Sequence, residues 1–337
     1  MSNDFREFQY MAGAAGYPDY FIRKENEKRT LKKLGLYTGA AVLVSIIVQS
    51  SIILSLELFG LMDRYYNDAY FSSATDILVV IIGMLLPFLF FGKKMKEASG
   101  REAIPELGSP CKKRLMLPAV AAGVGLCMLG NIVNSYITMF FDSFNVELTA
   151  PDIPMAEGVS GIILTFFRVA ITAAVVEEIA FRGYVMGSLR RYGDSFAIAV
   201  SAFVFAAIHG NMVQAPVALM AGFALGYLSV KTGTIWTGII IHAINNSISA
   251  IVYYLSEHFG QERIAIPYTL ALYGLIGIGL LCLLYFVNHT REVRLSVSDS
   301  LLGTGEKIRA FFLNPTMIIT MVYTLYVTLE YINPVQQ

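Results

Sequence analysis

Long apolar stretches alternate with short polar segments along most of the chain, and this alternation predicts the fold. An apolar run of about 18 or more residues can cross the roughly 30 Å hydrocarbon core of a bilayer as an α-helix. The pattern therefore predicts an all-α, polytopic transmembrane helix bundle with nine spans. The spans are expected at residues 35–60, 75–92, 114–141, 160–182, 195–210, 213–230, 234–256, 266–288 and 310–332.

Three of these runs have bounds that the pattern defines less sharply than the others. The fifth and sixth runs are short and are separated only by His209-Gly210-Asn211-Met212. The ninth run is interrupted near its start by Asn314-Pro315, and proline breaks the hydrogen-bond ladder of a helix.

Basic residues lie in every second loop, and this asymmetry predicts the orientation. Lysine and arginine collect in the first 33 residues, at 93–114, at 190–191, at 231 and at 291–309, whereas the loops between are mainly acidic. Basic loops stay on the cytoplasmic side of a membrane, so the N-terminus is expected inside and the C-terminus outside. Four parts follow: a cytoplasmic tail at 1–33, a transmembrane domain at 34–289, a cytoplasmic loop at 290–309 and a C-terminal helix with a short tail at 310–337.

The composition agrees with lipid as the surrounding solvent. The 337 residues are 55% hydrophobic and 15% charged, whereas soluble domains carry about 25% charged residues. We therefore expect an integral, multi-pass membrane protein with membrane lipid as a partner. There is no basic stripe with interleaved aromatic residues, so no nucleic-acid partner is expected.

Ionisable residues inside the predicted spans point to the functional region. Such side chains cost about 2.5–3.5 kcal/mol each and persist mainly where they face a cavity or one another. Glu178 and Arg182 are separated by one helical turn, which favours an ion pair. Glu177 points about 100° away and has no local partner, so it suits a general base or acid. The alternative is that both glutamates reach the cytoplasmic surface together with Arg182.

Two histidines and an asparagine extend this set. The fifth span ends at His209, and the seventh contains His242 and Asn246 one turn apart on one helix face. A lone membrane histidine is more often a packing residue than a catalyst. Because buried polar groups must find partners, we expect Glu177, His209, His242 and Asn246 to converge on one cavity within the membrane.

These residues form a recognisable set of motifs. Glu177-Glu178-Ile-Ala-Phe-Arg182 fits EExxxR, Phe205-Ala-Ala-Ile-His209 fits FxxxH, and His242-Ala-Ile-Asn-Asn246 fits HxxxN. In this order and spacing the chain resembles the CAAX prenyl protease 2 type of intramembrane protease, also called the CPBP or Abi family. The resemblance covers roughly residues 115–255, which would form the protease core.

The resemblance implies a hydrolytic mechanism. A water molecule would be held by Glu177 and His209 and activated by the glutamate to attack a peptide carbonyl. His242 and Asn246 would stabilise the developing oxyanion by hydrogen bonding, which is typically worth about 2.7–4 kcal/mol per donor in a dry site.

The same resemblance implies supporting roles and a substrate class. Glu178 and Arg182 would fix the helix and the position of Glu177. The substrate would be a membrane-associated or lipidated peptide or protein, cut by an endopeptidase near the cytoplasmic side. A prenylated CaaX protein is the substrate of the eukaryotic branch, whereas the compact motifs favour a bacterial cell membrane and peptide maturation or bacteriocin immunity.

The family has been described both as metalloproteases and as metal-independent glutamate enzymes, so the metal is a separate question. Glu177, His209 and His242 could form a three-ligand zinc site with an open fourth position. Against zinc, the chain has no HExxH pair, and the sequence offers no evident acceptor for the second ring nitrogen of His242, which a zinc-bound histidine usually needs. We therefore expect no tightly bound cofactor and keep zinc as the alternative.

Two other functions fit parts of the pattern. A non-catalytic scaffold of the same fold, for bacteriocin immunity or regulation, would not need the complete set of motifs. A transporter could use the buried Glu, His and Arg as an ion relay, but two matching repeats with broken helices are missing from the sequence.

The predicted topology also contains a conflict of depth. Glu177 falls in the inner part of span four, whereas His209 falls near the outer end of span five. Their convergence requires span four to end or bend near Gly183, or span five to be displaced. Residues 184–192 lying along the cytoplasmic interface would be one such arrangement. Arg168, deep in span four, has no acidic residue one turn away, and either faces the cavity or extends outward.

Overall fold

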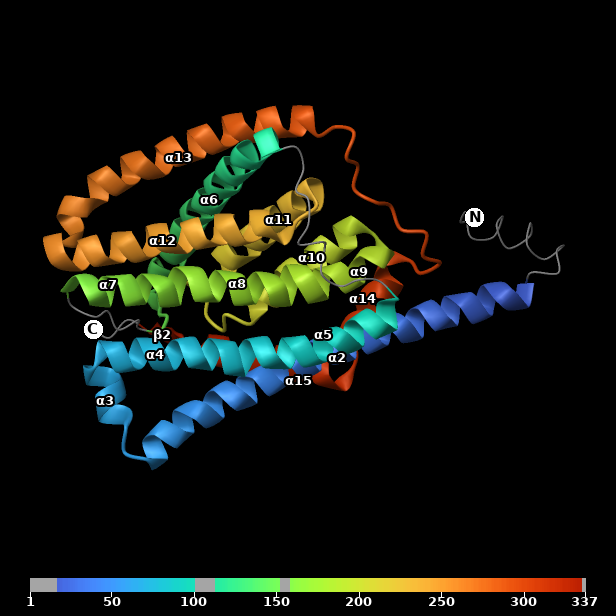
Figure 1. Cartoon of the computed structure of the whole chain (residues 1–337), viewed down its shortest axis with the longest axis horizontal. Helices are drawn as coiled ribbons and strands as arrows, with labels where there is room; N and C mark the ends of the chain where they lie inside the picture. The colour runs from blue at the N-terminus through green and yellow to red at the C-terminus, as the bar shows by residue number, and fades with distance from the viewer. Residues whose placement is uncertain (1–16, 101–112, 152–157, 335–337) are drawn as a thin grey trace.

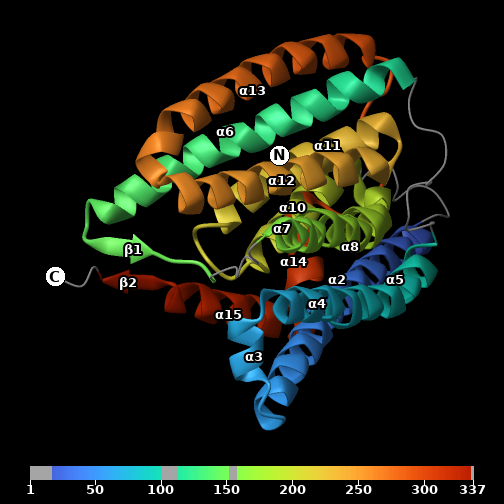
Figure 2. The ribbon, with the colours of Figure 1, turned by 60° about the vertical axis from the view of Figure 1, so that its left-hand side comes forward.

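A computed structural model describes residues 17–100, 113–151 and 158–334, and it is an α-helical bundle as expected (Figure 1). The helices are α2 (Tyr17–Leu58), α3 (Met62–Asn67), α4 (Ala69–Val80), η1 (Ile81–Leu85), α5 (Leu86–Ser99), η2 (Lys113–Leu115), α6 (Met116–Asp142), α7 (Gly158–Phe166), η3 (Phe167–Thr172), α8 (Ala173–Glu178), η4 (Ile179–Met186), α9 (Gly187–Leu189), η5 (Arg190–Tyr192), α10 (Asp194–Ala207), α11 (Ala215–Thr232), α12 (Ile235–Phe259), α13 (Gln261–His289), α14 (Thr304–Phe312) and α15 (Pro315–Glu330). Two short strands, β1 (Val146–Leu148) and β2 (Ile332–Pro334), pair antiparallel beside the bundle (Figure 2).

All nine predicted apolar runs coincide with helices, but not all of these helices are long enough to cross a membrane. Within the described ranges six helices are long and apolar enough, and the α14–α15 pair would make a seventh. Helix α10 has only 14 residues, about 21 Å at 1.5 Å per residue. The rod from α7 to α9 is divided by the π-helical segments η3 and η4. The count of nine spans therefore stays a prediction.

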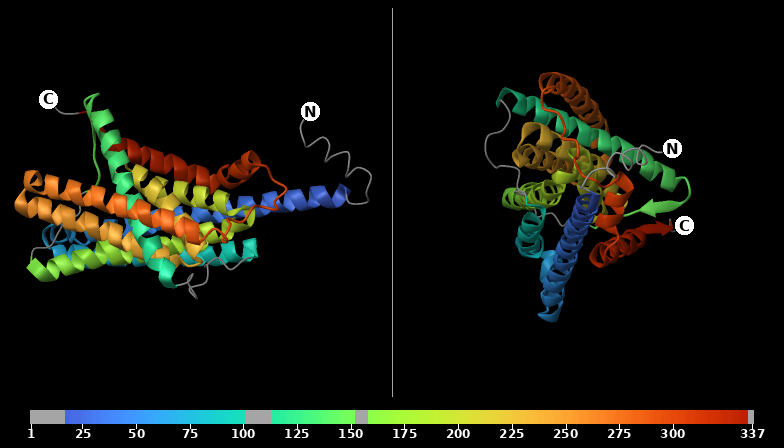
Figure 3. Two further views of the ribbon diagram at one scale, coloured as in Figure 1. Left: turned by 90° about the horizontal axis from the view of Figure 1, so that it is seen from above. Right: turned by 90° about the vertical axis from the view of Figure 1, so that its right-hand side faces the viewer.

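The loops that were assigned to one side of the membrane lie together at one end of the bundle. Figure 3 shows the long helices running between two ends, and in Figure 1 the start of α2 and strand β2 lie at opposite ends. At the end where α2 begins, basic residues join loops far apart in sequence: Arg191 donates to the carbonyl of Ser99, Lys231 to that of Thr290, and Lys24 pairs with Glu306. These described basic segments thus share one end of the bundle. The cytoplasmic assignment of this end stays a prediction, and the charged residues at 1–16, 101–112 and 152–157 lie outside the described part.

In both terminal parts a helix begins before the predicted apolar run. Helix α2 begins at Tyr17, well inside the predicted tail at 1–33. Near the other end of the chain, α14 and α15 are bent by 80° at the predicted interruption, where Asn314 Oδ1 accepts a hydrogen bond from the backbone N–H of Met317. Proline at the first helical position suits such a start because it has no N–H to satisfy.

The first and last helices pack closely against each other. Thr316 Oγ1 donates to the carbonyl of Leu36 at 2.8 Å, and Thr320 Oγ1 donates to that of Gly39 at 3.2 Å. A Cβ atom on Gly39 would lie 2.6 Å from the backbone nitrogen of Met317. Glycine thus lets the backbones of α2 and α15 approach closely, as small residues do in membrane bundles.

Helices α6 and α13 form the opposite edge of the bundle and meet through another pair of glycines (Figures 1 and 2). A Cβ atom on Gly125 would lie 2.7 Å from the Cα of Gly279, so this crossing leaves no room for a side chain. Gly222 acts in the same way on α11, where a Cβ atom would lie 2.8 Å from the Cα of Ala202.

We expect Gly279→Leu to lower the free energy of unfolding by about 1–3 kcal/mol, because the new side chain meets backbone that cannot move aside. The matched control is Gly274→Leu on the same helix, where a Cβ atom would meet nothing within 4 Å. Thermal unfolding of the detergent-solubilised chain measures both, and equal losses would contradict the close approach of α6 and α13.

Candidate active site

The depth conflict is resolved by a helical hairpin that turns at Gly193. Span four does not end near Gly183, and the position of residues 184–192 relative to the membrane interface stays a prediction. The helical rod continues through η4 and α9, and Tyr184, Met186 and Leu189 are buried. Gly193 then adopts a φ of 103°, which favours glycine, and α10 starts in the reverse direction.

The two arms of this hairpin bring the site residues to one level. Glu177 lies 16 residues before Gly193, and His209 lies 16 residues after it. Each arm is about 24 Å long at 1.5 Å per residue, so both side chains lie at a similar depth in the bundle. Helix α10 is therefore not a displaced full span but a short arm that ends at the site.

Glu178 is the centre of a buried polar cluster beneath the cavity. Its Oε1 atom lies 2.9 Å from Arg182 Nη1 and 3.1 Å from His242 Nδ1. The side chain of Glu178 is 0% exposed and that of Arg182 is 1% exposed, so neither reaches the surface, which rules out the surface alternative for this pair. A Cβ atom on Gly238 would lie 2.5 Å from Glu178 Oε2, so only glycine leaves room for the carboxylate there.

Glu177 faces the other way and enters the cavity. Its side chain is 21% exposed, and its Oε2 atom lies 3.7 Å from Nε2 of His242. The two adjacent glutamates thus contact opposite nitrogens of one imidazole ring. Glu178 holds the ring by a hydrogen bond, whereas the wider separation leaves Glu177 room to contact a substrate or a water molecule.

Phe205 joins the other aromatic and cationic groups of the site. Its ring centroid lies 4.9 Å from that of His209 and 5.9 Å from that of His242, both edge-on, and the Arg182 guanidinium carbon lies 4.5 Å above the ring. The Phe205 carbonyl accepts a hydrogen bond from His209 Nδ1 at 2.8 Å. This interaction fixes the tautomer of a neutral His209, whose Nε2 atom is then an acceptor.

Asn246 is held by a carbonyl that the distorted helix makes available. Its Nδ2 atom donates to the carbonyl of Val169 at 3.1 Å, and its Oδ1 atom accepts from Asn245 at 3.3 Å. Val169 lies in η3, where the i→i+5 spacing of a π-helix changes which carbonyls the backbone satisfies. An amide has two N–H donors, so Asn246 keeps one for a ligand.

The predicted convergence is confirmed as geometry. One cavity of about 530 Å³ is lined by Glu177, His209, His242 and Asn246 together. Their catalytic roles stay predictions. Asn245, Val169 and Gly238 were not identified from the sequence, because the contacts that they make depend on how separate helices pack.

Arg168 has a partner that sequence spacing could not reveal. Its Nη1 atom lies 2.6 Å from Asp76 Oδ2, and the hydroxyl of Tyr65 donates to the other oxygen of Asp76 at 2.7 Å. All three residues line the same cavity, so Arg168 faces inward. Asp76 could have been identified from the sequence as a functional candidate, since it is an acidic residue inside an apolar run.

The donor set does not fit a zinc ion as it is arranged. Among the described residues, no three His, Cys, Asp or Glu side chains are grouped as a metal site would require. One sequence argument was nevertheless wrong: His242 does have an acceptor for its second nitrogen, namely Glu178. That contact fits a metal ligand and a metal-free site equally well.

A comparison with known proteins gives one match. Residues 159–248, about a quarter of the chain, match the family model of the type II CAAX prenyl endopeptidase Rce1-like proteins. No curated protein and no solved structure matches. The matched segment contains all six residues of the sequence-predicted site, Glu177, Glu178, Arg182, His209, His242 and Asn246.

We expect Glu178→Gln to lower the free energy of unfolding by about 3–5 kcal/mol, because it leaves Arg182 buried without its counter-charge. Glu25→Gln is the control, since Glu25 forms an i,i+4 pair of the same kind with Arg29 at the surface, and such pairs contribute little. Chemical denaturation of both variants in mixed micelles measures the difference. A Glu178→Gln variant as stable as the parent but fully inactive would show that Glu178 acts on the substrate rather than by positioning.

Proposed function

We propose that this chain, whose residues 159–248 match the model of the type II CAAX prenyl endopeptidase Rce1-like proteins, is an intramembrane endopeptidase of the CPBP family. It would hydrolyse a peptide bond of a membrane-associated or lipidated substrate. One observation carries the proposal: of two adjacent glutamates, Glu178 is locked in a buried ion pair while Glu177 faces a cavity beside His242. Such a separation of roles is what a general base and its support require.

Glu177 is the proposed general base. It removes a proton from a water molecule while the water oxygen attacks the peptide carbonyl carbon. Nε2 of neutral His209 accepts a hydrogen bond from the other O–H of that water, which keeps its hydrogen, so the two residues orient the water from two sides. When the C–N bond breaks, Glu177 returns its proton to the leaving nitrogen, and the products are an acid and an amine.

Asn246 is the proposed donor to the oxyanion. Its second amide hydrogen is available because only one is used by Val169. His242 donates its Nδ1 hydrogen to the paired carboxylate of Glu178, so its Nε2 atom carries a hydrogen only when the ring is doubly protonated. Asn246 can therefore donate to the oxyanion in both protonation states of His242, whereas His242 can donate only when its ring is doubly protonated.

We expect Glu177→Gln to lower kcat by about 10²–10⁴, the usual contribution of a general base, and Asn246→Ala by about 10²–10³, as for other oxyanion donors. Glu257→Gln, exposed on the helix that carries His242, should leave kcat unchanged. Cleavage of lipidated peptides by the chain in liposomes, followed by mass spectrometry, measures all three. Trapping with Glu177→Gln identifies the natural substrate.

The competing functions give different results in the same system. A scaffold keeps its phenotype in the Glu177→Gln variant, and a transporter loses ion flux without any cleavage by the parent. Either result would overturn the protease proposal.

We further propose that hydrolysis needs no tightly bound metal, since the Glu177, His209 and His242 side chains are not grouped as a zinc site. A catalytic zinc site holds one ion, so purified protein should contain less than about one zinc per chain. Activity should survive a chelator that enters the micelle. One zinc per chain by elemental analysis, with activity lost on chelation and restored by zinc, would show that the histidines are ligands.

A further inference from the structure

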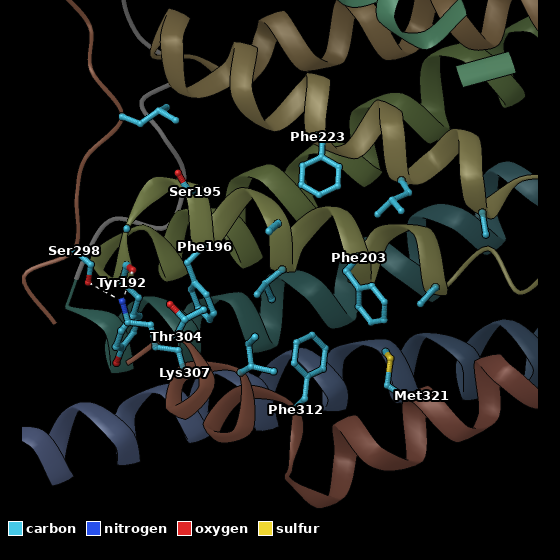
Figure 4. Close-up of a pocket in the computed structure, with 18 of the residues that line it drawn as sticks. Tyr192, Ser195, Phe196, Phe203, Phe223, Ser298, Thr304, Lys307, Phe312 and Met321 are labelled. Carbon is cyan, nitrogen blue, oxygen red and sulfur yellow. Dashed lines mark hydrogen bonds between the residues drawn. The ribbon is translucent and has the colours of Figure 1, made fainter. Parts of the chain in front are cut away.

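A second, larger cavity lies between α10 and α11 on one side and α14 and α15 on the other. Its volume is about 1410 Å³, and the segment 295–298 lies at one end (Figure 4). Part of its lining comes from α14 and α15, which lie outside the matched segment 159–248. We refer to it as the C-terminal groove.

The groove and the candidate active site lie on different faces of α10. Phe196, Ala199 and Phe203 follow each other at helical spacing and line the groove, whereas Phe205 lines the candidate active site. Each cavity therefore has its own set of side chains on this helix.

The walls of the groove are apolar, and two of their aromatic side chains are exposed. Phe203 is 49% exposed and Phe223 is 44% exposed, and the ring of Phe203 meets that of Phe312 at 5.6 Å across the groove. Figure 4 shows Phe203, Phe223 and Phe312 directed into the same space. In the membrane-spanning part of a protein, such a concave apolar surface is matched by hydrocarbon.

The length of the groove suits an acyl chain. It extends from Lys307 on α14 to Thr328 near the end of α15. Along α10 its lining runs from Ser195 to Ala207, about 18 Å at 1.5 Å per residue. One leaflet supplies about 15 Å, half of the hydrocarbon core, so a chain anchored at the Lys307 end would fill most of the groove.

The polar end of the groove carries a single cation. Lys307 is the one charged residue among the described residues that line it, and the hydroxyls of Ser195, Ser298 and Thr304 lie at the same end. Lys307 Nζ donates to Ser298 Oγ and to the carbonyl of Tyr192, both at 3.0 Å. An ammonium group has three donors, so one is left for an anion. Glu27, the carboxylate whose charge acts on Lys307, does not line the groove.

We propose that the C-terminal groove binds an acyl chain of an anionic phospholipid from the bilayer, with the phosphate of its headgroup at Lys307. The apolar walls accept the chain, and the cation with its neighbouring hydroxyls selects the charge. A zwitterionic lipid fits the walls equally well but brings its own cation to the same end of the groove.

A fluorescence measurement tests the preference directly. The chain has one tryptophan, Trp236, so Trp236→Phe combined with Phe203→Trp places the only fluorophore in the groove. The protein is reconstituted in nanodiscs with increasing fractions of phosphatidylglycerol or phosphatidylcholine whose acyl chains are brominated and quench tryptophan. One basic residue near the membrane surface adds about 1 kcal/mol of attraction to an anionic lipid. Half-quenching should therefore need about fivefold less phosphatidylglycerol than phosphatidylcholine.

Three control variants locate the effect. Leu281→Trp, in place of Phe203→Trp, reports on an exposed position of α13 and should respond equally to both lipids. Lys307→Gln should bring the fivefold ratio close to one, whereas Arg309→Gln, exposed on the same helix and outside the groove lining, should retain it. Ala199→Phe should weaken quenching by filling the groove without touching Lys307, which keeps the test valid if Lys307→Gln does not fold.

Several results would overturn the proposal. Equal quenching by both lipids would remove the headgroup preference, and an equal loss in Arg309→Gln would reduce it to general surface charge. Displacement of the brominated lipid by a short lipidated peptide at low concentration would assign the groove to the substrate. The quenching does not involve peptide hydrolysis, so an inactive enzyme would leave the lipid result standing.

Discussion

The buried contact of Glu178 with Arg182 and His242 is the constraint on which the rest of the site depends. A carboxylate and a guanidinium removed from water are costly unless they are paired with good geometry, so this cluster fixes the helix that carries both glutamates against α12. The absence of a side chain on Gly238 is what permits the approach. Once Glu178 is committed to the interior, the helical angle between adjacent residues directs Glu177 into the cavity.

The backbone around these residues departs from regular α-helix in a consistent way. The π-helical segments η3 and η4 lie immediately before and after α8, which ends with the two glutamates. Such segments are rare and occur often at functional sites, because the wider turn shifts side chains and changes the pairing of carbonyls. Here the shift gives Asn246 its acceptor, the carbonyl of Val169, and the Arg182 guanidinium lies over the ring of Phe205. The irregular helix and the converging side chains are therefore two aspects of one arrangement.

The sequence predicted the helical class, the positions of the apolar helices and the set of side chains that meet, because hydrophobic period and i,i+4 spacing are local properties. It did not predict the depth of His209, because the length of α10 relative to the rod depends on the turn at Gly193. It also missed the pairing of Arg168 with Asp76 and of His242 with Glu178. These contacts join residues 92 and 64 positions apart, and no local pattern encodes which helix faces which.

The packing of α2 against α15 has a consequence for how the protein is made. The segments in contact, around Gly39 and Thr316, are separated by almost the whole chain, and the hydrogen bonds of Thr316 and Thr320 close the bundle between its first and last helices. During synthesis α2 enters the membrane long before its partner leaves the ribosome. The face of α2 that carries Gly39 is therefore without its packing partner until α15 has been made, and the bundle can close only after synthesis of its last helix.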